Sequence, residues 1–188
     1  NKRQMSIPKN MTLQELLQWR FTESADEIAH KFKDRETSYK ELHIASNKIA
    51  NGLIKLDCVP DSRIAYLGKN SDYFFEFLAG TIKSGTVAVG VNWRLAPPEV
   101  KYVLDDSSSE IIFVGKEFYP IVEQIIDELP DIKKVIAVDG EHETFEDFIS
   151  WRDKQEETEI SIKTLDNDDI LQLYTSGTTG YPKGVQLT

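Results

Sequence analysis

The apolar positions of this chain fall into short continuous runs separated by segments with helical spacing. The runs are mostly apolar and lack the in-and-out alternation of a half-exposed strand: Ile64–Leu67, Thr86–Val91, Ile111–Val114, Val135–Val138 and Ile170–Tyr174. Runs of this length and composition are typical of strands in a parallel sheet that is covered on both faces. They therefore predict five buried strands.

Between the predicted strands, apolar residues recur every three or four positions, as on one face of a helix. The predicted helices are Tyr39–Leu56, a stripe from Phe74 to Ile82, a start at Pro97-Pro98-Glu99 and a stripe from Phe118 to Leu129 that Pro130 ends. The sequences Thr12-Leu-Gln-Glu15 and Ser38-Tyr-Lys-Glu41 are capping boxes, which mark two helix starts. This order of elements predicts an α/β fold with a doubly wound, mostly parallel sheet flanked by helices.

By pattern and composition the chain divides into four segments. Residues 1–60 are a helical lead-in with a small hairpin predicted over Lys31–Thr37, turning at Asp34-Arg35, and residues 61–150 are the repeating strand–helix core. The segment Trp151–Asp169 is rich in charge and poor in periodic apolar positions, which predicts a polar connection. Residues 170–188 have the pattern of a strand, a glycine-rich loop and a second strand, Val185–Thr188.

Charge and composition exclude several classes of protein. The net charge is −10 and no basic stripe is present, which argues against nucleic-acid binding. Any polyanionic ligand must therefore be held by a local group of donors. No apolar run approaches the length of a membrane span, so we expect no integral membrane segment. Cys58 is the only cysteine, which excludes an intrachain disulfide and favours a cytoplasmic location.

The richest group of candidate binding residues lies in Tyr174-Thr-Ser-Gly-Thr-Thr-Gly-Tyr-Pro-Lys-Gly184. Its glycines let the backbone approach a ligand closely, and successive backbone N–H groups in such a loop can surround an anion. Four hydroxyl side chains and the ammonium of Lys183 add further donors. The combination predicts a polyphosphate-binding loop. The alternative is a flexible glycine-rich hairpin with an exposed lysine.

The P-loop of kinases and GTPases is the nearest rival motif. Counted from Gly177, the lysine stands at the correct spacing, but Pro182 replaces the required glycine. Gly184 replaces the hydroxyl residue that would hold magnesium, and the segment that follows has the pattern of a strand rather than a helix. We therefore reject the P-loop interpretation.

The loop closely resembles the signature loop of the adenylate-forming superfamily, which comprises acyl- and aryl-CoA synthetases, firefly-type luciferases and the adenylation domains of peptide synthetases. Earlier elements resemble that family in the same order along the chain: Ser38–Leu42, Asp61–Ser71 and Ile82–Leu95. The loop reads Gly-Thr-Thr-Gly and the third element contains Val-Asn-Trp-Arg-Leu. Both resemble CoA ligases more than peptide-synthetase domains.

The resemblance implies an ATP-dependent acyl-CoA synthetase that activates a carboxylic acid, by our interpretation a fatty acid, and transfers it through an acyl-adenylate to CoA. The residues that would bind the ATP phosphates are Thr175, Ser176, Gly177, Thr178, Thr179, Gly180 and Lys183. Thr175 is also the candidate contact to Mg²⁺. The alternatives are an aryl-CoA ligase, a luciferase-like adenylating enzyme or a non-catalytic nucleotide-binding module.

Several elements of that family are not present in this chain. They are a histidine shortly after the second strand, the acidic magnesium ligand, the ribose-binding aspartate, the hinge and the C-terminal domain with its catalytic lysine. The resemblance thus places no catalytic residue here, and we expect this piece alone to be inactive. The chain starts at Asn1 and ends at Thr188 without a stop signal, so we expect a longer natural protein.

Other polar residues have more ordinary interpretations. Asn92-Trp93-Arg94 follows a predicted strand, where α/β folds place ligands, but a surface arginine is more often a solvated charge. His30, His43 and His142 are scattered and lack a partner at metal-ligand spacing. We expect them to be surface or core residues.

Overall fold

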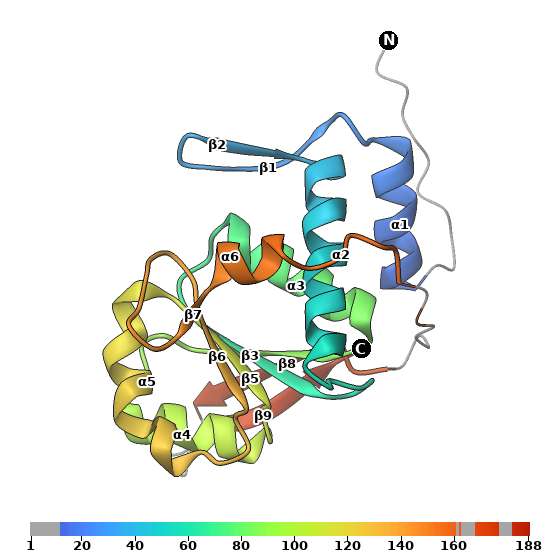
Figure 1. Cartoon of the computed structure of the whole chain (residues 1–188). Coiled ribbons are helices and arrows are strands. Elements are labelled where there is room, and N and C mark those ends of the chain that lie inside the picture. Colours follow the sequence, from blue (N-terminus) through green and yellow to red (C-terminus); the bar gives the residue numbers. More distant parts are fainter. Residues whose placement is uncertain (1–11, 161, 163–167, 177–181) are drawn as a thin grey trace.

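The computed structural model describes residues 12–160, 162, 168–176 and 182–188, which form a sheet between two layers of helices (Figure 1). The strands of the main sheet are β3 (Arg63–Leu67), β4 (Val87–Val91), β5 (Ile111–Val114), β6 (Lys134–Ala137), β7 (Glu146–Asp147), β8 (Leu171–Ser176) and β9 (Pro182–Leu187). Their order is β7-β6-β5-β3-β4-β8-β9. Strand β9 is antiparallel to β8, and the other neighbouring pairs are parallel. The predicted α/β fold with a mostly parallel sheet is confirmed.

Helices cover both faces of the sheet. They are α1 (Leu13–Glu23), α2 (Tyr39–Lys55), α3 (Asp72–Ser84), α4 (Pro97–Asp106), α5 (Tyr119–Ile125) and α6 (Phe148–Asp153). Helices α2, α3 and α6 pack on one face, through Ile49, Phe77 and Trp151. Helices α4 and α5 pack on the other face, and α1 packs on α2 and α3 through Phe21.

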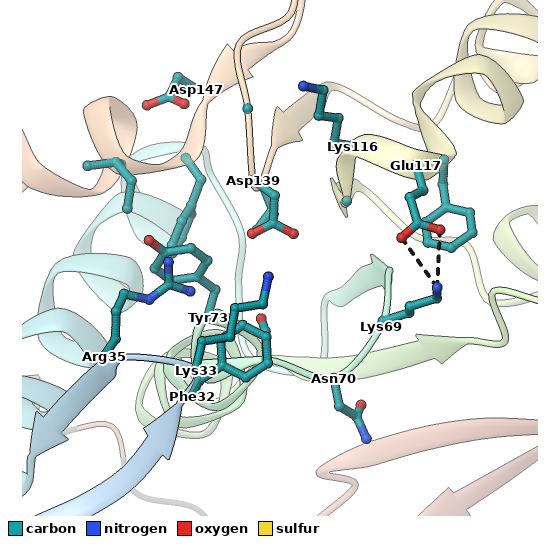
Figure 2. A pocket seen from close by; sticks show the side chains of 17 residues that line it. Phe32, Lys33, Arg35, Lys69, Asn70, Tyr73, Lys116, Glu117, Asp139 and Asp147 are labelled. Atoms are coloured by element: carbon teal, nitrogen blue, oxygen red, sulfur yellow. Dashed lines mark hydrogen bonds and ion pairs between the residues drawn. The ribbon is translucent and has the colours of Figure 1, made fainter.

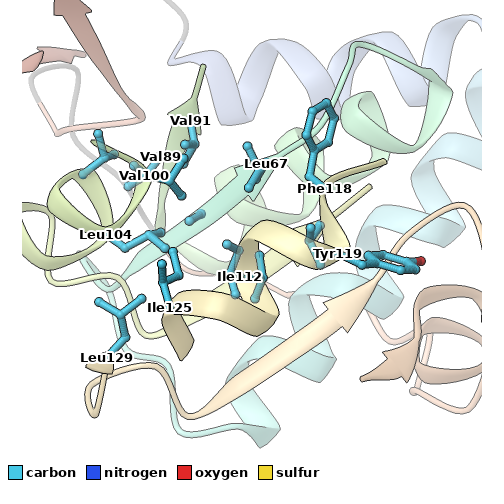
Figure 3. Close-up of a cluster of buried hydrophobic side chains, with 14 of the residues drawn as sticks. Leu67, Val89, Val91, Val100, Leu104, Ile112, Phe118, Tyr119, Ile125 and Leu129 are labelled. Atoms are coloured by element: carbon cyan, nitrogen blue, oxygen red, sulfur yellow. The ribbon is translucent and has the colours of Figure 1, made fainter. Parts of the chain in front are cut away.

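The core under α4 and α5 is the larger of the two apolar layers (Figure 3). Leu104 and Ile125 from these helices meet Val89 and Ile112 from the strands, and the exposed fraction of each is 3% or less. Because the strands are covered on both faces, their residues are apolar in succession. This is why the continuous runs in the sequence located β3, β4, β5 and β6 to within one residue of each end, whereas the run Ile170–Tyr174 stops two residues before the end of β8.

The predicted helix starts are confirmed. Ser38 Oγ accepts a hydrogen bond from the backbone N–H of Glu41 at 3.1 Å, and the Glu41 carboxylate accepts one from the N–H of Ser38 at 3.2 Å. Thr12 and Glu15 make the same reciprocal pair at the start of α1. Helix α4 begins at Pro97 as expected, because proline suits the first turn, where its missing N–H is not needed.

The stripe from Phe118 to Leu129 was expected to be one helix, and this prediction is wrong in part. Only Tyr119–Ile125 is α-helical, between 3-10 turns at Lys116–Phe118 and Ile126–Glu128. Pro120 explains the start, because it fixes the first turn of α5. The whole stripe nevertheless faces the core, so the prediction of burial was correct.

The predicted polar connection Trp151–Asp169 starts too early. Its first residues belong to α6, where Phe148 and Trp151 are buried with exposed fractions of 1% and 2%. The charged residues around Trp151 concealed a short helix that has an apolar side facing the sheet. The two-residue strand β7 was also not predicted.

The predicted hairpin over Lys31–Thr37 is present but longer, and it turns one residue earlier. Its strands are β1 (Ile28–Phe32) and β2 (Arg35–Ser38), which form a separate two-stranded sheet. The turn lies at Lys33-Asp34, and Lys33 has a φ of 54°. Arg35, expected in the turn, is therefore the first residue of β2.

Candidate functional site

The two ends of the predicted phosphate loop lie opposite each other in the β8–β9 hairpin. Thr175 is the Cα partner of Lys183, and Ser176 is the partner of Pro182. The predicted binding residues Gly177, Thr178, Thr179 and Gly180 lie outside the described residues. The structure thus brings Thr175, Ser176 and Lys183 together at the base of the loop, although they are up to eight positions apart in the sequence.

The hairpin opens at the edge of the sheet where ligands bind in α/β folds. Strands β3, β4, β5, β6 and β8 are parallel, so their carboxyl ends share this edge. Strand β3 leads into α3 on one face, whereas its neighbour β5 leads into α5 on the other. This change of face makes a topological switch point between β3 and β5, where such folds form a ligand crevice.

A cavity of about 1000 Å³ occupies this switch point (Figure 2). Its walls come from the tip of the β1–β2 hairpin, the loops after β3 and β5, the end of β6 and the start of α6. Strand β8 is two strands away from β3, so the phosphate loop starts roughly 10 Å along the same edge. The loop and the cavity can therefore both contact ligands that lie along the carboxyl ends of the strands.

Two of the cations that line the cavity are paired with carboxylates. The guanidinium of Arg35 donates to both carboxylate oxygens of Asp72, at 2.9 and 2.7 Å, and this bond raises the pKa of Arg35. Lys69 Nζ lies 3.2 Å from the carboxylate of Glu117. Because both cations are already paired, neither is a free binding charge.

Lys33 and Asp139 are different, because their charged groups point into the cavity (Figure 2). Neither makes a hydrogen bond or an ion pair within the part of the chain that the structure describes. Burial raises the pKa of Asp139, and the positive charge of Arg35 opposes that shift. An ammonium can pair with an anionic ligand group, and a carboxylate can accept from a hydroxyl or amide. Sequence reasoning missed both, although Asp139 directly follows a predicted strand at the ligand edge.

The segment after β4 also lies at this edge. The indole of Trp93 has Lys69 Nζ at 4.9 Å and Arg94 Cζ at 4.3 Å from its ring centroid, and it packs on Phe118. Arg94 is exposed, as expected of a solvated charge. Its backbone N–H donates to Asn92 Oδ1 at 3.0 Å, which shapes the turn after the strand.

The histidines have the ordinary roles that the sequence suggested. His142 Nε2 lies 2.6 Å from Glu123, His30 stacks on Phe75 and His43 packs on Phe21. Among the described residues, no group of three or more His, Cys, Asp or Glu side chains is placed to hold a metal ion. No helix in these ranges is long and apolar enough to cross a membrane.

Comparisons with known proteins agree on one family. The family model described as AMP-binding enzyme matches residues 17–188. The fatty acid–acyl-carrier-protein ligase ScoC of Streptomyces coeruleorubidus is 42% identical over 154 residues, which are 81% of this chain and 28% of that protein. The 3-hydroxybenzoate–CoA/4-hydroxybenzoate–CoA ligase of Thauera aromatica is 34% identical over 155 residues, which are 81% of this chain and 29% of that protein.

A solved structure extends the likeness to three dimensions. The anthranilate CoA ligase AuaEII, solved in complex with anthranoyl-AMP, superposes with a TM-score of 0.89 at 28% identity. The match covers 97% of this chain and 36% of that one. The chain thus spans less than a third of the curated relatives and about a third of the solved ligase.

Proposed function

The chain belongs to the AMP-binding enzyme family, and we propose that the full-length protein is an ATP-dependent acid–thiol ligase. It would activate a carboxylic acid as an acyl-adenylate and then transfer the acyl group to a thiol. The similar proteins include ligases for fatty and for aromatic acids. The resemblance noted in the sequence and the family agree at this level.

The observation that carries the proposal is the register of the β8–β9 hairpin. Thr175 and Lys183 are paired across the base of a loop whose sequence is rich in glycine and hydroxyl groups. The hairpin opens at the ligand edge of the sheet. A loop held at both ends, with backbone N–H groups, hydroxyl groups and an ammonium, suits a polyphosphate. This supports phosphate binding by Thr175, Ser176, Gly177, Thr178, Thr179, Gly180 and Lys183.

The reaction places clear demands on these residues. A carboxylate oxygen of the acid bonds to the α-phosphorus of ATP, the bond from that phosphorus to the oxygen bridging to the β-phosphate breaks, and pyrophosphate leaves. Because both reactants are anions, positioning and charge neutralisation must supply most of the catalysis. The loop would hold the β- and γ-phosphates in line, and Lys183 would balance their charge. In the second step the thiol attacks the acyl carbonyl and AMP leaves.

Magnesium would be bound mostly by ATP itself. Mg²⁺ usually keeps several waters and takes one or two protein ligands together with substrate phosphates. The hydroxyl of Thr175 is our candidate protein ligand, and the ion would neutralise phosphate charge during the reaction.

For the substrates we propose a fatty acid and CoA. The 42% identical relative acts on a fatty acid but uses acyl-carrier protein, so that protein is the specific alternative acceptor. An aromatic acid is the alternative substrate, because the Thauera aromatica relative is a hydroxybenzoate ligase. We also propose a cytoplasmic location, which rests on the single cysteine.

The proposal is tested by exchange of labelled pyrophosphate into ATP, catalysed by the full-length protein. Exchange should require a carboxylic acid, and the acids that support it define the substrate class. Product assays with CoA and with acyl-carrier protein then identify the acceptor. ATP binding without exchange for any acid would favour a non-catalytic nucleotide-binding module instead.

The residue-level prediction is that Lys183→Ala slows pyrophosphate exchange on the order of 100-fold, because one charged donor to the phosphates is lost. The matched control is Lys133→Ala. Lys133 precedes β6 at the opposite edge of the sheet and pairs with Glu110 at 3.0 Å. Its replacement should leave the exchange rate unchanged. Equal rates for Lys183→Ala and the wild type would rule out the phosphate role of Lys183.

A further inference from the structure

A chain of hydrogen bonds runs from β3 through β8 to the end of α4. Arg63 Nε donates to Gln172 Oε1 at 3.0 Å, and Gln172 Nε2 donates to the hydroxyl of Tyr174 at 2.9 Å. The Tyr174 hydroxyl donates in turn to Asp106 Oδ2 at 2.8 Å. We call these four residues the β8 hydrogen-bond chain.

The alternation of β8 explains why this chain can form. Gln172 and Tyr174 are two positions apart, so both side chains point to the same face of the sheet. Their exposed fractions are 6% and 9%, whereas Leu173 between them is 39% exposed. Burial and the hydrogen bond to Asp106 raise the pKa of Tyr174, so its hydroxyl remains protonated and can donate. Directional bonds to these two buried side chains fix the position of the strand more narrowly than apolar contact does.

The same side chains also restrain β9. Gly184 is the Cα partner of Tyr174. A Cβ at Gly184 would lie 3.1 Å from Gln172 Nε2 and 3.3 Å from Tyr174 Cζ. The absence of a side chain at Gly184 thus lets Gln172 and Tyr174 pack against β9. Both strands at the base of the loop are held by one group of contacts.

From this geometry we infer that Tyr174 is a positioning residue for the phosphate loop. The inference rests on the proposed function of that loop. Tyr174 directly precedes Thr175, and Gly184 directly follows Lys183. The hydroxyl of Tyr174 connects the base of the loop to α4, and through Gln172 to β3. A displacement of a substrate-binding group by about 1 Å can lower the rate by a factor of 100. The Tyr174 hydroxyl can therefore affect catalysis through the position of the loop, without contacting ATP.

A second buried tyrosine serves as a control that distinguishes a positioning role from a general contribution to stability. Tyr119 is 6% exposed, lies in the same apolar layer and donates its hydroxyl to the carbonyl oxygen of Gly140. It stands on α5, and its acceptor Gly140 follows β6, which β5, β3 and β4 separate from β8 in the sheet. Tyr119→Phe removes a comparable part-buried hydrogen bond, whereas Tyr174→Phe removes the bond that joins the base of the loop to α4.

The experiment compares these two variants in the full-length protein by pyrophosphate exchange. Tyr174→Phe should raise the KM for MgATP about 10- to 100-fold, while the KM for the carboxylic acid stays within about twofold of the wild type because the acid does not contact this loop in the proposal. Tyr119→Phe should leave the KM for MgATP close to the wild type, because its bond to Gly140 at the cavity does not reach β8. Melting temperatures of both variants show whether the losses of stability are similar.

Substitutions at Asp106 give an independent test. Because Asp106 is exposed, its variants should fold even if the Tyr174→Phe variant does not. Asp106→Ala removes the acceptor and should raise the KM for MgATP as Tyr174→Phe does. Asp106→Asn keeps an acceptor oxygen and should restore a KM close to the wild type.

The two proposals fail in different ways. If the wild type exchanges pyrophosphate and Lys183→Ala is defective, but Tyr174→Phe and Asp106→Ala keep the wild-type KM for MgATP, the positioning role is wrong and the proposed function stands. Equal KM changes in Tyr174→Phe and Tyr119→Phe would also overturn it. A wild type with no exchange for any acid would instead remove the proposed function.

Discussion

Strands β3 and β5 belong to the same sheet as the β8–β9 hairpin, yet different contacts hold them. In β5 each residue is fully buried and apolar, and in β3 Ile64, Ala65 and Leu67 are too. In the hairpin, Leu173, Val185 and Leu187 are 39% to 46% exposed. Two buried polar side chains, Gln172 and Tyr174, link the hairpin to β3 and α4 by hydrogen bonds.

This difference suggests that the inner strands mainly determine the stability of the fold, whereas the contacts of the hairpin mainly determine the position of the loop. Burial of apolar surface is non-directional and grows with the area buried, so the inner strands supply free energy of folding. Hydrogen bonds contribute less net free energy but depend strongly on distance and angle, so the β8 hydrogen-bond chain mainly sets position. A substitution in an inner strand should therefore change stability, and one at the base of the loop should change binding.

The largest expected effect is the loss of an inner-strand side chain. Phe113 is fully buried and its ring centroid lies 5.0 Å from that of Phe77 and 5.6 Å from that of Trp151. Phe113→Ala should lower the free energy of unfolding by about 3–5 kcal/mol, because it removes buried surface and leaves a cavity. Urea unfolding of the full-length protein measures this loss.

Leu173→Ala is the matched truncation in the hairpin. Because Leu173 is 39% exposed, truncation of its side chain should lower the free energy of unfolding by only about 0.5 kcal/mol. Similar losses for the two variants would mean that the hairpin contributes to stability as the inner strands do, and the comparison would fail.

Sequence patterns predicted the inner strands well and the site only in part. Ile111–Val114 was predicted with its true ends because all four residues are buried, so pattern and structure coincide. Trp151 was missed as a helical core residue because Arg152 and Asp153 beside it resemble a solvated segment. The bond between Tyr174 and Asp106 joins residues 68 positions apart. Only the packing of α4 against β8 creates it, so no local pattern could indicate it.

Lys83 shows what happens when a buried charge lacks a charged partner. It is 5% exposed, and its ammonium lies 2.8 Å from Asn47 Oδ1 and 2.8 Å from His43 Nδ1, both neutral groups when the histidine is unprotonated. Burial lowers the pKa of Lys83 to about 7, and the negative charge of Glu159 opposes that shift. Burial and the positive charge of Lys83 also lower the pKa of His43.

The direction of the Lys83 pKa shift predicts how stability depends on pH. From pH 7 up to the ordinary pKa of lysine, 10.5, the unfolded chain binds a proton at Lys83 that the folded chain does not. Stability should therefore rise with pH from 7 to 9, by at most about 1.4 kcal/mol per pH unit, and fall as the pH drops towards 7. Lys83→Met should remove this slope in urea unfolding at pH 7, 8 and 9.

The control for this slope is Lys55→Met, which changes an exposed lysine of α2. It should keep the pH dependence of the wild type. If Lys83→Met also keeps the pH dependence of the wild type, Lys83 is not the group that titrates. The pKa of Lys83 in the folded chain would then equal its value in the unfolded chain.

A substitution at Gly184 should also change stability only slightly, and it is the sharpest test of the comparison. Gly184 does not have a positive φ, so alanine brings no backbone strain there. Its Cβ would, however, press on Gln172 Nε2 and Tyr174 Cζ at 3.1 and 3.3 Å. Gly184→Ala should lower the free energy of unfolding by only about 1 kcal/mol, the lower end of overpacking effects.

The effect on ATP should be larger than this stability loss suggests, because the displaced atoms belong to the β8 hydrogen-bond chain. We expect the KM for MgATP in pyrophosphate exchange to rise about tenfold, in the direction of Tyr174→Phe. The double variant Gly184→Ala with Tyr174→Phe should be less than additive, because both changes act on one set of contacts. Additive effects would show that Gly184 and Tyr174 influence the loop separately, and that the hairpin is not held as one unit.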